Sequence, residues 1–197
     1  MTKSSLDSFI QSIEDVKKLI AIAISGLICS QVIALLVGIQ PPWPKGILIL
    51  TSMIELLVLM MAWHFSSVSE KMNTGKIFVI LFSLLCFFSL AYVFMYSLFV
   101  YNIPGTSTDI VLGCGLTHDS QLVLSLNKID LKTITDTCPG EFTRILSSAE
   151  FEATRVWTPW TVKLNQVVIF ALWLAAFSCL AAFMGIFVAY HKQRQSP

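Results

Sequence analysis

Four long apolar runs constrain this chain more than any other feature of its sequence. They cover residues 19–40, 46–65, 77–101 and 167–190. An α-helix rises 1.5 Å per residue, so about 20 apolar residues cross a hydrocarbon core of about 30 Å. Since each run reaches that length, the sequence predicts four transmembrane helices. A composition that is 55% hydrophobic and only 13% charged agrees with this class of protein.

The residues outside the runs are too few for a separate soluble domain. Of the 197 residues, they comprise an N-terminal segment (1–18), two short connectors (41–45 and 66–76), a long polar loop (102–166) between the third and fourth runs, and a short tail (191–197). We therefore expect one membrane domain over residues 19–190, with an all-α fold: a four-helix transmembrane bundle capped by the loop. The first run is longer than the apolar core of a signal peptide and is interpreted as an uncleaved span.

Lysine and arginine near the ends of the runs predict the orientation. If the N-terminus is inside, the short segments on that side hold Lys3, Lys17, Lys18, Lys71, Lys76, Lys192 and Arg194. On the other side only Lys45, Arg155 and Lys163 lie close to a span end, because the remaining basic residues are spread through the long loop. We therefore expect both termini in the cytoplasm and the loop outside the cell or in a lumen.

The cysteines fall into two groups. Cys29, Cys86 and Cys179 lie inside apolar runs, where a thiol is usually a small packing residue. Cys114 and Cys138 are the two cysteines of the long loop. An isolated pair facing an oxidising compartment predicts a disulfide, which would stabilise the loop by about 3–4 kcal/mol in the chain-entropy treatment. The alternative is two free thiols in a cytosolic loop.

Shorter patterns outside the runs predict local elements. Alternating apolar residues between Leu122 and Leu131 indicate a β-hairpin. From Gly140 onward apolar residues recur at helical spacing and predict a helix that ends before Pro159. The segment 1–18 predicts an amphipathic helix, which either lies on the inner leaflet or extends the first span.

Three tryptophans lie where apolar runs meet polar sequence. Trp43 is in the proline-rich turn between the first two runs, and Trp157 and Trp160 precede the fourth. Tryptophan is enriched at membrane–water interfaces because its ring is large and apolar while its N–H is polar. We interpret these three residues as interface anchors, with ligand or partner binding as the alternative.

Small residues recur every four positions in the first and fourth runs. The first run contains Gly26, Ser30, Ala34 and Gly38, and the fourth contains Ala181, Gly185 and Ala189. Small residues four apart line one face of a helix and let two backbones approach closely in lipid. We expect these faces to pack the first span against the fourth or to form the seam of a homo-oligomer.

Glu55 is the most unusual residue of the apolar runs because it lies near the centre of the second. A charged carboxylate at mid-bilayer costs about 2.5–3.5 kcal/mol even on the mildest insertion scale. Gln31 or Ser30 of the first run, or Ser89 and Tyr92 of the third, could bond to it. Three interpretations remain: a structural link between helices, an ion or proton pathway, or a contact with the span of a partner subunit.

Motifs for catalysis are missing from the sequence. It contains no Cys-x-x-Cys pair, no glycine-rich phosphate loop and no cluster of carboxylates, and its histidines lack ligand companions at useful spacing. We therefore expect no enzyme, no catalytic residues, no cofactor and no metal site. A net charge of +1 gives no reason to expect a nucleic-acid partner.

Two sets of short motifs resemble four-pass proteins of animal cells. Pro42-Trp43-Pro44-Lys45-Gly46-Ile47, followed by Ser69-Glu70-Lys71, looks like the membrane-spanning four-domains family. Thr135-Asp136-Thr137-Cys138-Pro139, with Thr143-Arg144-Ile145 and the later Trp157 and Pro159, is similar to keratinocyte-associated four-pass proteins. The chain departs from true tetraspanins, since Gly113-Cys114-Gly115 stands where they have Cys-Cys-Gly.

This resemblance implies a multi-pass plasma-membrane protein that acts through lateral partners. Members of the membrane-spanning four-domains group have been linked to receptor complexes and calcium signalling. The leading hypothesis is a non-enzymatic adaptor or organiser that binds other integral membrane proteins within the bilayer and through its loop. The alternative is a pore-forming or regulatory channel subunit with Glu55 in the ion path.

Overall fold

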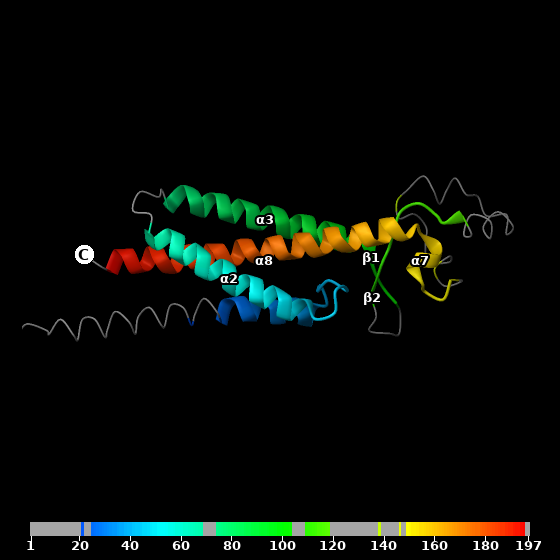
Figure 1. Ribbon diagram of the computed structural model, residues 1–197, viewed down its shortest axis with the longest axis horizontal. Coiled ribbons are helices and arrows are strands. Elements are labelled where there is room, and N and C mark those ends of the chain that lie inside the picture. Colours follow the sequence, from blue (N-terminus) through cyan, green and yellow to red (C-terminus); the bar gives the residue numbers. More distant parts are fainter. Residues whose placement is uncertain are drawn as a thin grey trace, which may run out of the picture. The chain divides into compact units, whose positions relative to one another are not determined.

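The structure is a computed structural model, and it describes residues 21, 25–68, 74–103, 109–118, 138, 146 and 149–195. Most of these residues are helical (Figure 1). After an initial helix, Ser25–Val37, the elements follow in the order α2 (Ile47–Val68), α3 (Thr74–Phe99), β1 (Val100–Asn102), β2 (Asp109–Val111), α7 (Ala153–Val156) and α8 (Pro159–Gln195).

Three of the helices are long and apolar enough to cross a membrane. Their apolar stretches are Ile47–Phe65, Gly75–Phe99 and Pro159–Tyr190, and they correspond to the second, third and fourth predicted spans. Of the first predicted span, the structure describes a shorter apolar helix, Ser25–Val37. Residues 19–20 and 22–24 of that span lie outside the described residues. The described part of the chain is thus that of a multi-pass membrane protein.

Gly38 ends the first helix, which gives it a role different from the packing role predicted for it. Its φ of 72° is in the left-handed region that glycine adopts without strain. The Gly38 N–H bonds to Leu35 O and the Ile39 N–H bonds to Ala34 O. This is the Schellman arrangement, which satisfies carbonyls that the end of a helix would otherwise leave unpaired.

The ends of α3 and α8 differ from the predicted span ends. α3 ends at Phe99 because the next residues form β1, which pairs antiparallel with β2 and matches Val100 with Val111. α8 begins at Pro159, eight residues before the predicted start at 167. Proline suits the first position of a helix, since its missing N–H would have no partner there. α8 also continues to Gln195, into the segment predicted as a tail.

The chain divides into two compact units. The first contains the initial helix, α2, residues of α3 up to Ser89 and residues of α8 from Leu174 onward. In it Leu27, Leu59, Ala181 and Val188 form a buried apolar cluster. The ring of Phe78 on α3 meets that of Phe183 on α8 edge-on, with centroids 5.0 Å apart. Side chains from all four helices therefore pack within this unit.

The second unit contains residues 41–45 and 90–173. We call its described part between Val100 and Thr158, together with the first turns of α8, the cap. The cap has its own buried apolar cluster, formed by Leu112, Leu116, Leu146, Val156, Trp157 and Val162. The long loop therefore contributes to a packed core.

The helix predicted from Gly140 to the residue before Pro159 is wrong between Ala149 and Phe151. These residues form a turn, in which Glu150 and Phe151 have φ values of 54° and 61°. The Phe151 N–H bonds to Leu146 O, and helix resumes only at α7. Of the apolar residues that predicted a continuous helix, Leu146 is buried in the cap core, and Ala149 and Ala153 pack against that core. The hairpin at 122–131 and the helix at 1–18 lie outside the described residues.

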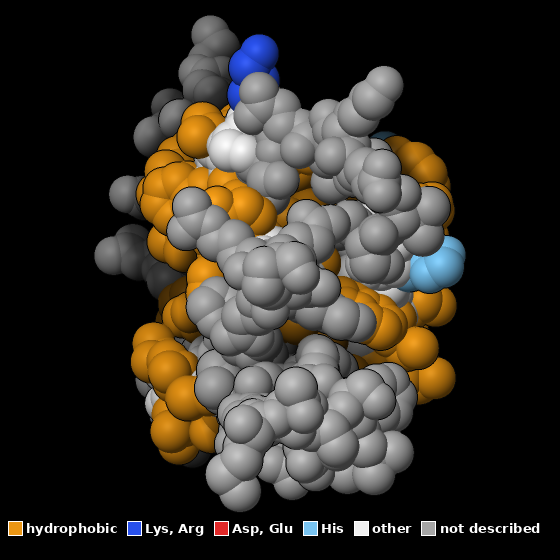
Figure 2. Space-filling view, turned by 90° about the vertical axis from the view of Figure 1, so that its left-hand side faces the viewer, with side chains coloured by type: hydrophobic (Ala, Val, Ile, Leu, Met, Phe, Trp, Pro, Cys, Tyr) orange, Lys and Arg blue, Asp and Glu red, His pale blue; other side chains and the backbone are white. Residues whose placement is uncertain are grey.

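The membrane-length helices expose large apolar side chains, as helices in contact with lipid do. Met53 on α2 and Phe87 on α3 are 65% and 63% exposed. In the view of Figure 2, the described side chains are mainly hydrophobic. The apolar surfaces of the three helices indicate contact with a lipid bilayer.

Candidate functional site

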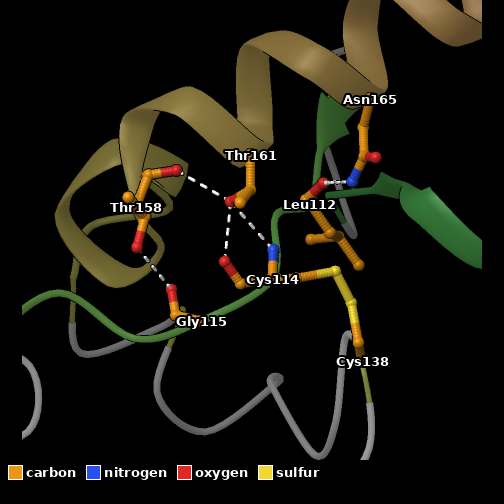
Figure 3. Close-up of a disulfide and its surroundings, with 7 residues drawn as sticks. All are labelled: Leu112, Cys114, Gly115, Cys138, Thr158, Thr161 and Asn165. Atoms are coloured by element: carbon orange, nitrogen blue, oxygen red, sulfur yellow. Dashed lines mark hydrogen bonds between the residues drawn. A yellow bond between two sulfur atoms is a disulfide. The ribbon is translucent and has the colours of Figure 1, made fainter.

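The predicted disulfide is confirmed: Cys114 and Cys138 are joined across 24 positions, with Cα atoms 5.3 Å apart (Figure 3). It lies between α3 and α8. Cys138 is exposed and Cys114 is partly buried. Because Cys114 follows directly after three buried residues of the cap, the bridge ties residue 138 to the edge of the cap core.

The backbone of Cys114 is held by α8 as well as by the disulfide. The Cys114 N–H donates to Thr161 Oγ1 over 3.0 Å, and the same hydroxyl lies 2.7 Å from Cys114 O, to which it can donate (Figure 3). One α8 side chain therefore serves both polar groups of this residue. Satisfying such groups matters in a partly buried site, because an unpaired one costs about 1–3 kcal/mol.

Asn165 of α8 and Thr158, the residue directly before α8, also bind the neighbouring backbone. Asn165 is buried and donates from Nδ2 to Leu112 O over 2.9 Å. Thr158 donates to Gly115 O from both its backbone N–H (2.9 Å) and its hydroxyl (3.1 Å). An isolated antiparallel bridge pairs Leu116 with Trp157. We call this set of contacts between residues 112–117 and 156–165 the clamp.

Gly113 lets the two sides of the clamp approach closely. A Cβ atom added there would lie 2.7 Å from Trp157 Cβ, 2.8 Å from Thr161 Oγ1 and 2.8 Å from Val162 Cγ2. These separations are shorter than real Cβ contacts allow. The glycine is therefore required by the close approach of the backbone to α8.

The three tryptophans predicted as interface anchors have different environments. Trp43 is 44% exposed and its ring meets Phe170 edge-on, with centroids 6.0 Å apart. Trp160 is 71% exposed on the first turn of α8. Trp157 is only 2% exposed, because it packs inside the cap core. The anchor interpretation therefore does not fit Trp157, whose ring contacts protein.

Glu55 lies on the buried face of α2 and is bonded to Gln31, one of the partners predicted for it. Gln31 Nε2 donates to Glu55 Oε2, and Gln31 Oε1 lies 3.0 Å from the hydroxyl of Ser52, which can donate to it. Glu55 and Gln31 are only 3% and 7% exposed. Within the part of the chain that the structure describes, Glu55 Oε1 is buried and receives no hydrogen bond. Ser30, another predicted partner, donates instead to Leu27 O.

The small residues of α8 are buried, and they pack against α2 as well as against the first helix. A Cβ at Gly185 would lie 2.8 Å from Leu59 O and 2.9 Å from Ala62 Cβ, both on α2. A Cβ at Gly26 would meet Met184 of α8 at 3.4 Å. Ala181, Ala189 and Ala34 are 0%, 2% and 5% exposed. α8 therefore packs against both the first helix and α2.

The clamp residues Thr158, Thr161 and Asn165 were not predicted from the sequence. Their spacing of three and four residues places them on one face of a helix that begins at Pro159. A polar residue before proline, followed by polar residues at this spacing, was the signal that could have identified them. Ser52 was missed as well, although it lies one turn before Glu55.

Among the residues that the structure describes, no three His, Cys, Asp or Glu side chains are grouped to hold a metal ion. No protein-family model, no curated protein and no solved structure matches this chain.

Proposed function

We propose that this protein is a non-enzymatic multi-pass membrane adaptor that binds other integral membrane proteins, laterally through its spans and through its cap. In this proposal residues 19–40 form a fourth span, both termini are cytoplasmic and the cap faces outside, most simply at the plasma membrane. The resemblance to four-pass proteins of the tetraspan type supports the same function.

The clamped, disulfide-closed cap is the observation that carries this proposal. A connecting loop needs neither a buried core nor a bridge, whereas a recognition surface benefits from both. Ordering the surface in advance lowers the entropy lost when a partner binds. The cap combines the Cys114–Cys138 bridge, the core around Trp157 and the contacts of Thr161 and Asn165, which together fix the segment 112–117 before any partner arrives.

Replacing both Cys114 and Cys138 with serine tests the role of the cap. We expect the variant to insert normally, because its apolar helices are unchanged, but to lose the membrane proteins that co-purify with the wild type in mild detergent. The loss of the cross-link releases residue 138 from residue 114 and costs about 3–4 kcal/mol of cap stability. Quantitative mass spectrometry of the purified complexes measures this loss.

The matched control is Cys86→Ser, which removes an exposed free thiol of α3 and leaves the cap intact. It should retain the wild-type set of partners. If the double serine variant also retains that set at the same abundance, the cap is not the recognition surface and the proposal is wrong.

The proposed orientation gives a second expected result. An epitope tag after Pro197 should be stained only in permeabilised cells, whereas a tag inserted at Asn127 should be stained on intact cells or in sealed vesicles of lumenal orientation. The reason is the excess of lysine near the span ends on the side of the termini. The reverse staining pattern would contradict both the orientation and the placement of the disulfide in an oxidising compartment.

Glu55 supports a second candidate function, a pore-forming or regulatory channel subunit. A carboxylate near the middle of a membrane-length helix is costly and marks a functional site by default. The buried Glu55 Oε1, which receives no hydrogen bond from the described residues, favours this candidate. The bond from Gln31 favours the alternative, a polar link between the first helix and α2.

Glu55→Gln separates these two functions. In an adaptor the amide can still accept the hydrogen bond from Gln31, so we expect unchanged stability, unchanged partners and no change in membrane conductance. In a channel the loss of the carboxylate should alter conductance or its response to pH, measured in planar bilayers. Gln31→Leu is the companion variant: it removes the donor, and we expect it to lower stability in detergent by about 1–2 kcal/mol, the range of model-peptide interhelical hydrogen bonds.

A further inference from the structure

The first turns of α8 have two faces of different character. Val162, Asn165 and Ile169 face the protein and are 3%, 8% and 1% exposed. On the other side Trp160, Leu164 and Val167 are 71%, 46% and 50% exposed, at a spacing of four and three residues. We call this second set, together with the exposed Lys163, the outer stripe. It is apolar except for that one lysine.

The outer stripe continues the lipid-facing surface of α8. The apolar stretch of the helix, Pro159–Tyr190, has 32 residues and is therefore about 48 Å long. This helix length exceeds the hydrocarbon core of a bilayer, which is about 30 Å thick. At the usual tilt of about 20°, it matches the full thickness of the bilayer with its headgroups, about 40–45 Å. The length of α8 thus places the outer stripe at the level of the headgroups on the cap side of the membrane.

The residue types of the outer stripe suit that level. A tryptophan ring favours the headgroup layer because it joins a large apolar surface to a polar N–H. A lysine there can bury its methylene chain among lipids and place its ammonium group near a phosphate. Lys163 makes no salt bridge to any residue in the described ranges, so its charge is available to such an anion.

We propose that the outer stripe lies in the phospholipid headgroup layer, so that the cap rests on the membrane surface instead of standing clear of it. The clamp enforces this position, because Thr161 and Asn165 tie the backbone of residues 112–114 to the same two turns of α8 that carry Trp160 and Lys163. A cap held in this way offers its partners a surface at the level of the membrane.

Tryptophan fluorescence in lipid nanodiscs tests the proposal with purified protein alone. Wild type and Trp160→Phe are placed in phosphatidylcholine nanodiscs with or without a nitroxide on the choline headgroup. In a parallel experiment, iodide is added to the water phase of the nitroxide-free nanodiscs. The signal lost in the variant belongs to Trp160. We expect the headgroup nitroxide to quench most of that signal and iodide to quench little of it.

Trp43→Phe is the matched control, because Trp43 is also exposed but contacts Phe170, about 15 Å further along α8 than Trp160 by helical rise. The headgroup nitroxide should quench the signal of Trp43 less than that of Trp160, because Phe170 lies nearer the centre of α8. Retention of the disulfide on a non-reducing gel checks that each variant has folded.

Two results would overturn the proposal. Quenching of the Trp160 signal by iodide and not by the headgroup nitroxide would place the stripe in water. Protection from both quenchers would mean that protein, such as a second copy of the chain, covers it. Neither result depends on an adaptor function, because no partner is present, and loss of partners in the cysteine variant would leave the lipid contact unaffected.

Discussion

Gly185→Ala is expected to destabilise the packing of α8 on α2 by about 1–3 kcal/mol, the usual cost of forcing extra volume into a packed interior. The new methyl group would lie 2.8 Å from Leu59 O and 3.3 Å from Trp63 N. Both are backbone atoms of α2, so they can yield only if the whole helix shifts. A larger side chain, as in Gly185→Leu, should have a larger effect.

Gly26→Ala is the matched control for this prediction. It also adds a methyl group to a helical glycine, so any gain in helix propensity should equal that of Gly185→Ala. Among the residues that the structure describes, its new Cβ would meet only Met184 Cε, at 3.4 Å, at the end of a flexible side chain. Reversible unfolding in mixed detergent micelles measures both variants. Equal free energies of unfolding would show that Gly185 is not a close-packing position.

Gly113→Ala is expected to open the clamp. A methyl group there would lie within 2.8 Å of Trp157, Thr161 and Val162 at once, and relief requires the segment to move away from α8. The movement would also break the buried bond from Asn165 to Leu112 O, which adds about 1–3 kcal/mol to the cost of overpacking. Of the changes considered, this one should have the largest effect on the cap.

Hydrogen exchange at the amides of Cys114 and Thr158 measures the opening of the clamp, because both amides are bonded across it. Exchange should become much faster in Gly113→Ala while the amides of α2 keep their protection. Thr154→Val serves as control: Thr154 is an exposed residue of α7, and exchanging its hydroxyl for a methyl group should leave the clamp closed. Unchanged exchange at Cys114 in the glycine variant would refute the close approach.

The parts of the fold that follow from summed local properties could be predicted from the sequence. Hydropathy adds up over about 20 residues, so a few exceptions such as Glu55 do not hide a span. The disulfide followed from the isolation of Cys114 and Cys138 in one polar segment. Gln31 was among the predicted hydrogen-bond partners of Glu55, because the neighbouring apolar runs contain few other polar residues that could bond to it.

The clamp could not be predicted in the same way, because it depends on contacts between segments that are far apart in the sequence. Thr161 and Asn165 made the start of α8 look like loop, since they lower its hydropathy. They are polar because they bind the backbone of the cap. Trp157 was predicted to lie at the membrane interface for the same reason: its burial depends on residues far from it in the sequence, such as Leu116, with which it forms a β-bridge.

The clamp also has a consequence for how the protein is made. Synthesis proceeds from the N-terminus, so Cys114 and Cys138 are both added to the chain before Thr161 and Asn165. The groups that fix the backbone of Cys114 therefore arrive last, on the helix that must still enter the membrane. In the proposed orientation, pairing of the two thiols in their final geometry therefore requires the start of α8 to be in place, so that the loss of free thiol at Cys114 and Cys138 would report that the last helix has folded.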